Sequence, residues 1–227
     1  SDFFSSLIEH KIGGQVSSSS YCRRNERMSN ECINTSLNEA LRQAGLDLAN
    51  GKVASYIPEL ARADGSLLGL CLLDCEGRIY RAGDCDTSFT VQSVGKVFLL
   101  LAALERFGEQ AVFERVGMEP SGAPFSELST LGEFSEKPSN PFINAGAIVL
   151  ASLASTVMTF EEFLDFVRGL CGNQTLQVNE AVYLSESAHS ERNHSLAWEL
   201  KRLKLLENDV QTSLDFYTRL CAIEASG

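Results

Sequence analysis

Residues 90–98 read TVQSVGKVF, and this stretch decides how the rest of the chain is interpreted. Ser93 and Lys96 are three residues apart, a spacing that places two side chains one turn apart on the same face of a helix. A serine hydroxyl is a weak nucleophile at neutral pH and needs a base beside it. The stretch therefore predicts a nucleophile and an amine within reach of each other at the start of a helix.

The residues that follow, 97–107, are apolar except for Glu105 and Arg106. A helix that is apolar nearly all round is expected inside the protein. Burial disfavours an ammonium and lowers the pKa of Lys96, which is what a general base requires. With Ser93 at the helix tip, its backbone N–H is expected to serve as one oxyanion donor, at the positive end of the helix dipole.

Two other interpretations of the same residues exist. Ser93 could be an ordinary helix cap with Lys96 as a solvated lysine of the first turn, and the stretch alone leaves this open. A phosphate-binding Walker A loop requires a glycine five residues before the Gly-Lys pair, and Ser or Thr directly after it. Those positions hold Thr90 and Val97, so this interpretation is discarded.

Composition excludes several classes of protein. The chain has 227 residues, 44% of them hydrophobic, and a net charge of −11. Because no basic stripe is visible, we expect no nucleic-acid partner. No apolar stretch reaches the length of a membrane span, and the N-terminus lacks the pattern of a secretory signal. The seven cysteines form no C-x-x-C pair. They are typical of reduced thiols, so we expect a cytoplasmic protein.

Hydrophobic periodicity and turn residues predict the order of elements. Residues 1–31 are polar and are expected to form an extension or linker, with a short helix at 3–10. A helix at 35–49 precedes a hairpin of residues 66–73 and 78–82, whose first strand looks buried on both faces. Further helices are predicted at 145–157, 159–170, 178–187, 192–206 and 210–225. This order favours an α+β fold over alternating βαβ units.

Seven segments together resemble the serine-dependent glutaminases, a family within the serine β-lactamase and penicillin-binding superfold. They run in the family's order: residues 51–60 (GKVASYIPEL), 92–96 (QSVGK), 117–122 (GMEPSG), 137–148 (KPSNPFINAGAI), 183–186 (YLSE), 192–193 (RN) and 216–221 (FYTRLC). The resemblance implies an antiparallel sheet with a mostly helical subdomain. It also implies a catalytic domain over residues 32–227 that lacks the family's C-terminal segment.

The resemblance implies a role for each matching residue. Ser93 would be the acylated nucleophile and Lys96 its base, in the hydrolysis of L-glutamine to L-glutamate and ammonia. The positions that hold the amino-acid substrate would be Tyr56, Gln92, Ser93, Asn144, Glu186, Asn193 and Tyr217. Neither a metal nor an organic cofactor is implied. Family members commonly assemble, so a homodimer or homotetramer is expected. Gly95 departs from bacterial relatives, which often have serine there.

The chemistry of glutamine fits this residue set. An α-ammonium in a desolvated pocket needs a carboxylate, which Glu186 supplies. An α-carboxylate needs neutral donors, and asparagine amides and tyrosine hydroxyls supply them. A site built this way rejects amides that lack these groups, because its own polar atoms would be left unpaired.

Simpler roles remain open for several of these residues. Asn144 is a good helix N-cap, Glu186 and Asn193 would ordinarily be solvated, and Tyr56 and Tyr217 could be packing residues. A metal site at His189 and His194 has little support from their spacing. Two other functions also remain. One is an acyl-serine enzyme that reacts with β-lactams. The other is a non-catalytic family member that binds an amino acid or a partner protein.

Overall fold

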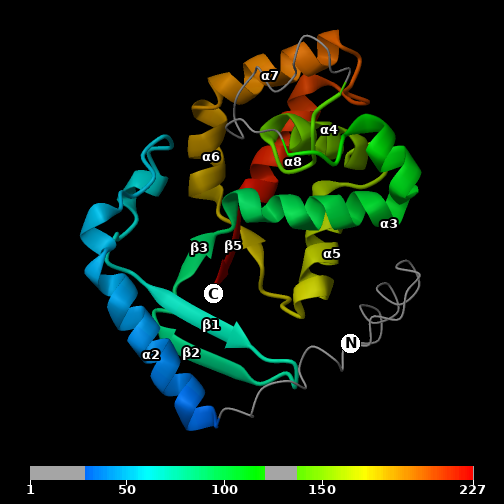
Figure 1. The fold of residues 1–227 in the computed structure, drawn as a ribbon. Helices are drawn as coiled ribbons and strands as arrows, with labels where there is room; N and C mark the ends of the chain where they lie inside the picture. Colours follow the sequence, from blue (N-terminus) through cyan, green and yellow to red (C-terminus); the bar gives the residue numbers. More distant parts are fainter. Residues whose placement is uncertain (1–28, 121–136, 227) are drawn as a thin grey trace. The chain divides into compact units, whose positions relative to one another are not determined.

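The computed structural model describes residues 29–120 and 137–226. The predicted helix at 3–10, and nearly all of the predicted extension over 1–31, lie outside these residues. The chain divides into two compact units, one formed by residues 1–50 and 67–85 and the other by residues 51–66 and 86–227. Figure 1 shows the helices and strands of both units. Among the described residues, none of the helices has the length and apolar content that crossing a membrane requires.

The first unit is a hairpin with one helix against it. Helix α2 spans Asn30–Leu46, and strands β1 (Gly69–Leu73) and β2 (Ile79–Gly83) pair antiparallel with Leu72 opposite Tyr80. A short 3₁₀ turn, η1, follows α2 at Leu48–Asn50. The Tyr80 hydroxyl donates to Asn30 Oδ1 at 2.9 Å, so this face of the hairpin lies against α2. The predicted hairpin is therefore confirmed.

The prediction that the first strand is buried on both faces is wrong. Leu73 is 68% exposed, and no residue of β1 is fully buried. In a two-stranded hairpin with one helix, only the face toward the helix is covered, and Leu73 lies on the other face. The boundaries of α2 also differ from the prediction, because the Ser29 side chain caps the helix through the backbone N–H of Cys32. The helix therefore starts at Asn30 instead of residue 35.

The second unit contains a three-stranded antiparallel sheet and most of the helices. Strand β5 (Ile223–Ser226) lies between β3 (Ser88–Thr90) and β4 (Gln177–Val178). The helices are α3 (Gly95–Arg115), α4 (Asn144–Ala154), α5 (Phe160–Cys171), α6 (Glu180–Ala188), α7 (Glu191–Arg202) and α8 (Val210–Cys221). Two 3₁₀ turns, η2 (Leu60–Arg62) and η3 (Gln92–Val94), complete it. The α+β prediction is confirmed.

Helix α4 forms the centre of this unit. All 11 of its residues are buried, and it packs against α3, α7 and α8 (Figure 1). Each fully buried leucine or isoleucine contributes about 1.5–3 kcal/mol. Gly146 lets a neighbouring loop approach the first turn, since a Cβ there would lie 2.0 Å from the carbonyl oxygen of Asn140. The first residue of this helix, Asn144, is thereby held in a densely packed environment.

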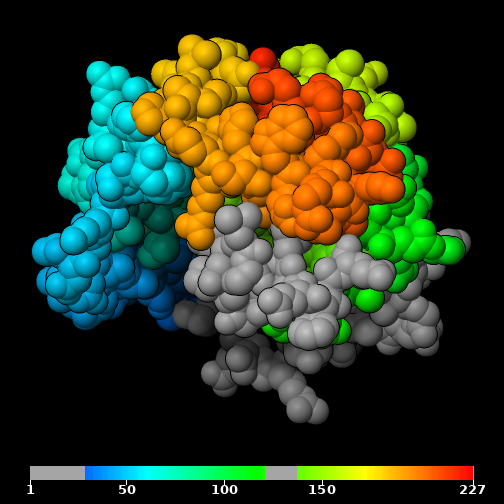
Figure 2. All heavy atoms as spheres, turned by 90° about the horizontal axis from the view of Figure 1, so that it is seen from above, coloured from blue at the N-terminus to red at the C-terminus, as the bar shows by residue number. Residues whose placement is uncertain are grey.

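The helices predicted from residue 145 onward correspond to α4, α5, α6, α7 and α8, but several end earlier than predicted: α4 ends at Ala154 and α7 at Arg202. Helix α5 begins with a capping box, in which Thr159 and Glu162 bond each other's backbone. The predicted helix at 210–225 is too long, because α8 ends at Cys221 and residues 223–226 form β5. Pairing to β3 and β4 on both sides gives this strand hydrogen bonds that helix propensity does not anticipate. Helices α6 and α7 form an exposed face, gold to orange in Figure 2.

Candidate active site

A cavity of about 330 Å³ lies within the second unit. Its lining comes from the turn before α3 and from α4, α6, α7 and α8, together with the segment that leads to η2. The lining residues are Tyr56, Ile57, Gln92, Ser93, Asn144, Glu186, His189, Ser190, Arg192, Asn193, Tyr217 and Cys221. All seven residues that the sequence assigned to the substrate are therefore brought together, from positions far apart along the chain.

Ser93 lies in the 3₁₀ turn η3, one turn before the body of α3. The helix itself begins at Gly95, with Val94 in the N-cap position. Ser93 is therefore not a conventional helix cap, and this alternative is wrong. Gln92, directly before it, has a φ of 48°, in the left-handed region that non-glycine residues seldom adopt. Gln92 directly precedes the proposed nucleophile, Ser93. Strained backbone conformations of this kind are often found in active sites.

Lys96 is buried, with 1% of its surface exposed, although it carries an ionisable amine. Its Nζ donates to the carbonyl oxygen of Phe142 at 3.0 Å and to Asn144 Oδ1 at 2.8 Å. Burial lowers the pKa of the Lys96 ammonium, while negative charge on Cys221 and Glu186 would raise it. The alternative of a solvated lysine is wrong, and the expected direction of the pKa shift is confirmed.

Asn144 connects the groups around the cavity. Its Oδ1 accepts from Lys96 and also from the Tyr217 hydroxyl at 3.2 Å, and its Nδ2 donates to Asn193 Oδ1 at 3.1 Å. The N-cap position of α4 is Ile143, so the alternative of Asn144 as the cap is wrong. With both ends of the amide bonded, its orientation is fixed, and Asn193 keeps its own amide nitrogen as a donor.

Glu186 on α6 is buried, with 7% of its surface exposed, so the alternative of a solvated glutamate is wrong. Its Oε2 oxygen has no hydrogen-bond partner among the described residues. Burial raises the pKa of Glu186 to about 7, an effect that the Lys96 charge reduces. A buried carboxylate oxygen without a donor is costly, and such an atom in a cavity indicates a place for a cationic or donor group of a ligand.

Tyr56 and Gln92 form the more open side of the cavity. Tyr56 is 67% exposed, and its hydroxyl lies 3.4 Å from Gln92 Oε1. The other end of the Gln92 amide donates to Thr90 Oγ1 at 3.1 Å. Tyr217, in contrast, is buried, and burial raises the pKa of its hydroxyl well above the ordinary value. Of the two tyrosines, only Tyr217 is part of the closed interior.

The sequence did not identify every residue of the cavity. Cys221 lies one turn after Tyr217 on α8, and burial raises the pKa of its thiol far above the ordinary value. The spacing of four from Tyr217 was a usable signal for this residue. His189 and Ser190 also line the cavity, but they follow the end of α6, where periodicity gives no information about side-chain direction.

The two histidines considered for a metal bond to different groups. His189 Nδ1 is 2.7 Å from the Ser185 carbonyl oxygen, and His194 Nδ1 is 3.0 Å from the Ser190 hydroxyl. Within residues 29–120 and 137–226, no group of three or more His, Cys, Asp or Glu side chains is placed to hold a metal ion.

Helices α6 and α8 are also joined by residues that do not line the cavity. The Tyr183 hydroxyl donates to Asp215, and the Arg219 guanidinium lies 4.4 Å from the centre of the Tyr183 ring. Arg219 Nε also donates to Asp215 Oδ2 at 2.9 Å. Tyr183 is one turn before Glu186 on α6, and Asp215 and Arg219 flank Tyr217 on α8. These three residues, the α6–α8 clamp, therefore fix the helices that supply Glu186 and Tyr217.

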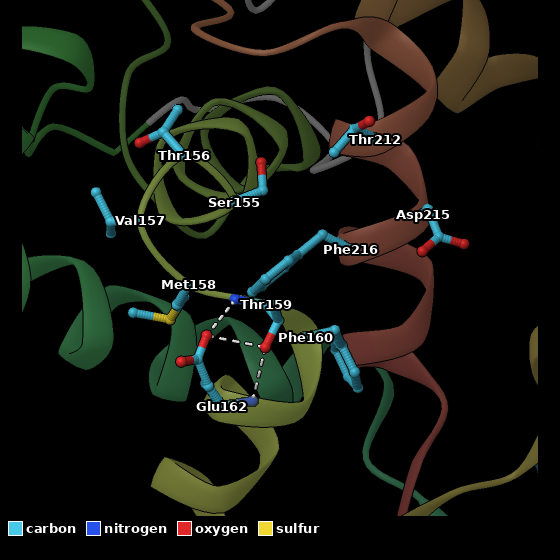
Figure 3. Close-up of a pocket in the computed structure, with 10 residues that line it drawn as sticks. All are labelled: Ser155, Thr156, Val157, Met158, Thr159, Phe160, Glu162, Thr212, Asp215 and Phe216. Atoms are coloured by element: carbon cyan, nitrogen blue, oxygen red, sulfur yellow. Dashed lines mark hydrogen bonds between the residues drawn. The ribbon is translucent and has the colours of Figure 1, made fainter.

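A second cavity, of about 440 Å³, lies beside the first turns of α5 and α8. Figure 3 shows its lining, including Phe216, Asp215 and the capping box of Thr159 and Glu162. Polar groups here have partners within the protein: Thr159 and Glu162 bond each other, and Thr212 Oγ1 donates to Asp209 at 2.6 Å. No unpartnered buried polar atom was found among the described residues of this cavity. It therefore lacks the ligand-directed feature that Glu186 gives the first cavity.

The buried lysine, the serine on a turn and the amide and carboxylate groups around one cavity define an α+β protein with a site suited to acyl transfer. Comparison with known proteins narrows this class. The family model for glutaminase matches residues 51–227. A curated glutaminase of Alkaliphilus metalliredigens is 42% identical over 183 residues, which is 79% of this chain and 60% of that relative.

Solved structures agree with the family match. A probable glutaminase, ybaS, has a TM-score of 0.80 at 31% identity and covers 88% of this chain and 65% of its own. A probable glutaminase from Bacillus subtilis, complexed with 6-diazo-5-oxo-L-norleucine, has a TM-score of 0.72 at 32% identity. It covers 88% of this chain and 62% of its own.

The chain belongs to the glutaminase family, and its neighbours have the β-lactamase-like fold. It spans about 60% of the length of the curated relatives that it matches.

Proposed function

We propose that this chain binds L-glutamine in the cavity and hydrolyses it to L-glutamate and ammonia. The observation that carries the proposal is the buried Oε2 of Glu186, which has no partner among the described residues and belongs to a side chain that lines a cavity with amide donors. An α-ammonium would supply the missing donor. The Asn193 amide and a tyrosine hydroxyl would hold the α-carboxylate, which leaves the side-chain amide toward Ser93.

In the proposed reaction, Ser93 Oγ attacks the carbon of the side-chain amide, and its proton passes to neutral Lys96. Lys96 then gives this proton to the amide nitrogen, and the C–N bond breaks. Ammonia is released, and the acyl group remains bound to Ser93 as an ester. Water attacks the ester and gives a proton to Lys96, the bond to Ser93 Oγ breaks, and Ser93 regains its proton as glutamate forms. The backbone N–H of Ser93 is the proposed oxyanion donor.

The contacts of Lys96 support a role as base. The Lys96 amine donates to the Phe142 carbonyl and to Asn144 Oδ1, and these bonds fix its position. Burial favours the neutral form, because it lowers the pKa of the ammonium. The site thus favours the protonation state in which Lys96 can accept the Ser93 proton.

The test is glutamate formation by the purified chain, with Ser93→Ala as the variant. Turnover is expected to disappear in Ser93→Ala, whereas calorimetry is expected to detect glutamine binding to this variant. Glutaramic acid, which is glutamine without its α-amino group, is expected to bind at least ~10²-fold more weakly, because Glu186 then lacks its partner. Turnover that survives in Ser93→Ala would contradict the mechanism. Acylation of Ser93 by a β-lactam without glutamate formation would contradict the substrate.

Assembly into a homodimer or homotetramer and a cytoplasmic location stay predictions. Light scattering of the purified chain tests the first, and a monomer at micromolar concentration would contradict it. Fractionation of cells that produce the protein tests the second.

A further inference from the structure

The start of α3 and the end of α8 approach each other at Gly95 and Leu220. A Cβ atom added to Gly95 would lie 2.9 Å from Leu220 Cγ, 3.0 Å from Leu220 Cδ1 and 3.2 Å from the Leu220 carbonyl oxygen. These separations are shorter than a side chain tolerates without movement of its neighbour. The backbone of Gly95 has φ −55° and ψ −25°, which any residue adopts. With Leu220 in this position, limited space and not backbone conformation favours glycine here.

This contact lies between the segment that carries Ser93 and Lys96 and the part of α8 that carries Tyr217. Gly95 directly precedes Lys96 and is two residues after Ser93. Leu220 lies on α8 between Tyr217 and Cys221, which line the cavity. Leu220 is completely buried in the core, so it presents a fixed surface to α3. The separation of Gly95 and Leu220 therefore sets where the first turn of α3 lies relative to α8.

The position of Lys96 depends on that separation. Its Nζ reaches Asn144 Oδ1 at 2.8 Å and lies 5.9 Å from the centre of the Tyr217 ring. Asn144 is in turn bonded to Tyr217, so the amine is placed against groups on α4 and α8 together. A shift of α3 away from α8 would lengthen the bond from Lys96 to Asn144, with no change in any residue that touches substrate.

We propose that Gly95 and Leu220 are a positioning pair, matched in size, that holds Lys96 in register with Asn144 and Tyr217 for its action on Ser93. This inference rests on the function proposed above. Glu186 and Asn193, which are proposed to hold the substrate, lie on other helices, α6 and α7. Disturbing the pair is therefore expected to slow turnover more than it weakens substrate binding.

The experiment compares Gly95→Ala, Leu220→Ala and the double variant by kcat and KM for L-glutamine. Gly169→Ala on α5 is the matched control for the first change, since nothing lies within 4 Å of a Cβ there. Leu164→Ala, also on α5, is the control for the loss of a buried leucine. Thermal unfolding of each variant separates a loss of folding from a loss of activity.

We expect Gly95→Ala to lower kcat by ~10- to 10²-fold with KM changed less than about threefold, because small misplacements of catalytic groups are costly. Gly169→Ala should leave both constants unchanged. The double variant should recover at least about tenfold in kcat over Gly95→Ala, since Leu220→Ala removes Cγ and Cδ1, the two closest atoms. Equal activity of Gly95→Ala and Gly169→Ala would overturn the proposal, as would a double variant no faster than Gly95→Ala.

Crystal structures of the chain and of Gly95→Ala separate this inference from the proposed function. If the unaltered chain does not hydrolyse glutamine, the proposed function fails, but the distance from Lys96 Nζ to Asn144 Oδ1 is still measurable. A longer distance in Gly95→Ala supports the positioning pair. An unchanged distance overturns it.

Discussion

Two buried ionisable groups belong to the candidate site, and their surroundings differ: Glu186 lines the cavity, whereas Lys96 lies behind it and bonds to the lining residue Asn144. The Lys96 amine donates to two acceptors, the Phe142 carbonyl and Asn144 Oδ1. One oxygen of Glu186 is buried with no partner among the described residues. Burial shifts both groups toward their neutral forms, because it lowers the pKa of Lys96 and raises the pKa of Glu186 to about 7.

This difference separates a group that is ready for chemistry from a group that awaits a ligand. Lys96 is oriented by protein atoms alone, so its position does not depend on substrate. Glu186 gains its missing hydrogen bond only when a donor enters the cavity, and then the charged carboxylate becomes favourable. In the function proposed above, the first arrangement serves turnover and the second serves binding, so changes at the two residues should affect different constants.

Replacing Lys96 tests the first arrangement and should have the largest effect. Lys96→Met keeps an unbranched side chain but removes the amine, so turnover of glutamine should fall by at least ~10³-fold. The melting temperature should be unchanged or higher, because a buried amine is replaced by an apolar group. Lys201→Met, on the exposed part of α7, is the control and should keep full activity. A Lys96→Met variant with more than a tenth of the original rate would mean that the amine is not the base.

Replacing Glu186 tests the second arrangement. Glu186→Gln keeps the shape but removes the charge that would pair with an α-ammonium, so KM should rise ~10²-fold, with a smaller change in kcat. Steady-state kinetics on the two variants measure this split. Glu180→Gln, an exposed residue of the same helix, should change neither constant. If Glu186→Gln lowered kcat alone, the substrate would not be held as proposed.

The stability of the empty protein should depend on Glu186 in a direction set by its pKa. The folded-state pKa of about 7 lies above the ordinary value of 4.5, so the native protein holds this proton more tightly than the unfolded chain. Stability is therefore fully present below pH 4.5 and is lost as pH rises through 7. Glu186→Gln avoids this loss and should be more stable than the original by up to about 3 kcal/mol at pH 8.

Urea unfolding of both proteins at pH 5 and pH 8 measures this dependence. The difference between them should be small at pH 5, where Glu186 is largely protonated in the folded protein. A stability difference that is the same at both pH values, or that favours the original protein at pH 8, would show that the carboxyl group is not destabilised by burial.

The α6–α8 clamp should have the smallest effect. Tyr183→Phe removes the hydroxyl that donates to Asp215 but leaves the ring under Arg219. We expect a loss of about 1 kcal/mol in the free energy of unfolding, typical of one hydrogen bond, and a rise of KM by about two- to threefold. Chemical denaturation and kinetics on the same preparation check both values. An unchanged free energy of unfolding would indicate that the clamp does not tie the two helices.

Much of the fold was predictable because local signals agree with tertiary packing. The capping box of Thr159 and Glu162, the apolar residues of α4 and the turn of the β1–β2 hairpin each specify an element without reference to the rest of the chain. The predictions that were wrong fall where contacts with a distant segment determine the secondary structure. Residues 223–226 continue a helical pattern, but they become a strand because β3 and β4 lie on either side.

The residues of the candidate site also fall into two groups, those that the sequence identified and those that depend on tertiary packing. Motif order identified Ser93, Asn144, Glu186 and their neighbours, and these residues do line one cavity. Cys221 and Ser190 were not assigned to the site, although Cys221 lies within the segment 216–221, because the direction of both side chains depends on how α6, α7 and α8 pack. The sequence placed Ser93 at the tip of α3, whereas the structure places it in the preceding turn η3.

The sequence by itself determined the family, the residue types of the site and most helix boundaries, since these depend on local spacing and on side-chain chemistry. Only the tertiary structure decided which of the ionisable groups are buried and which of their atoms have partners. The contact of Gly95 with Leu220 joins segments 125 residues apart in sequence, and the unpaired oxygen of Glu186 depends on what packs around α6. Desolvation and steric fit are properties of packed neighbours, and no local pattern encodes them.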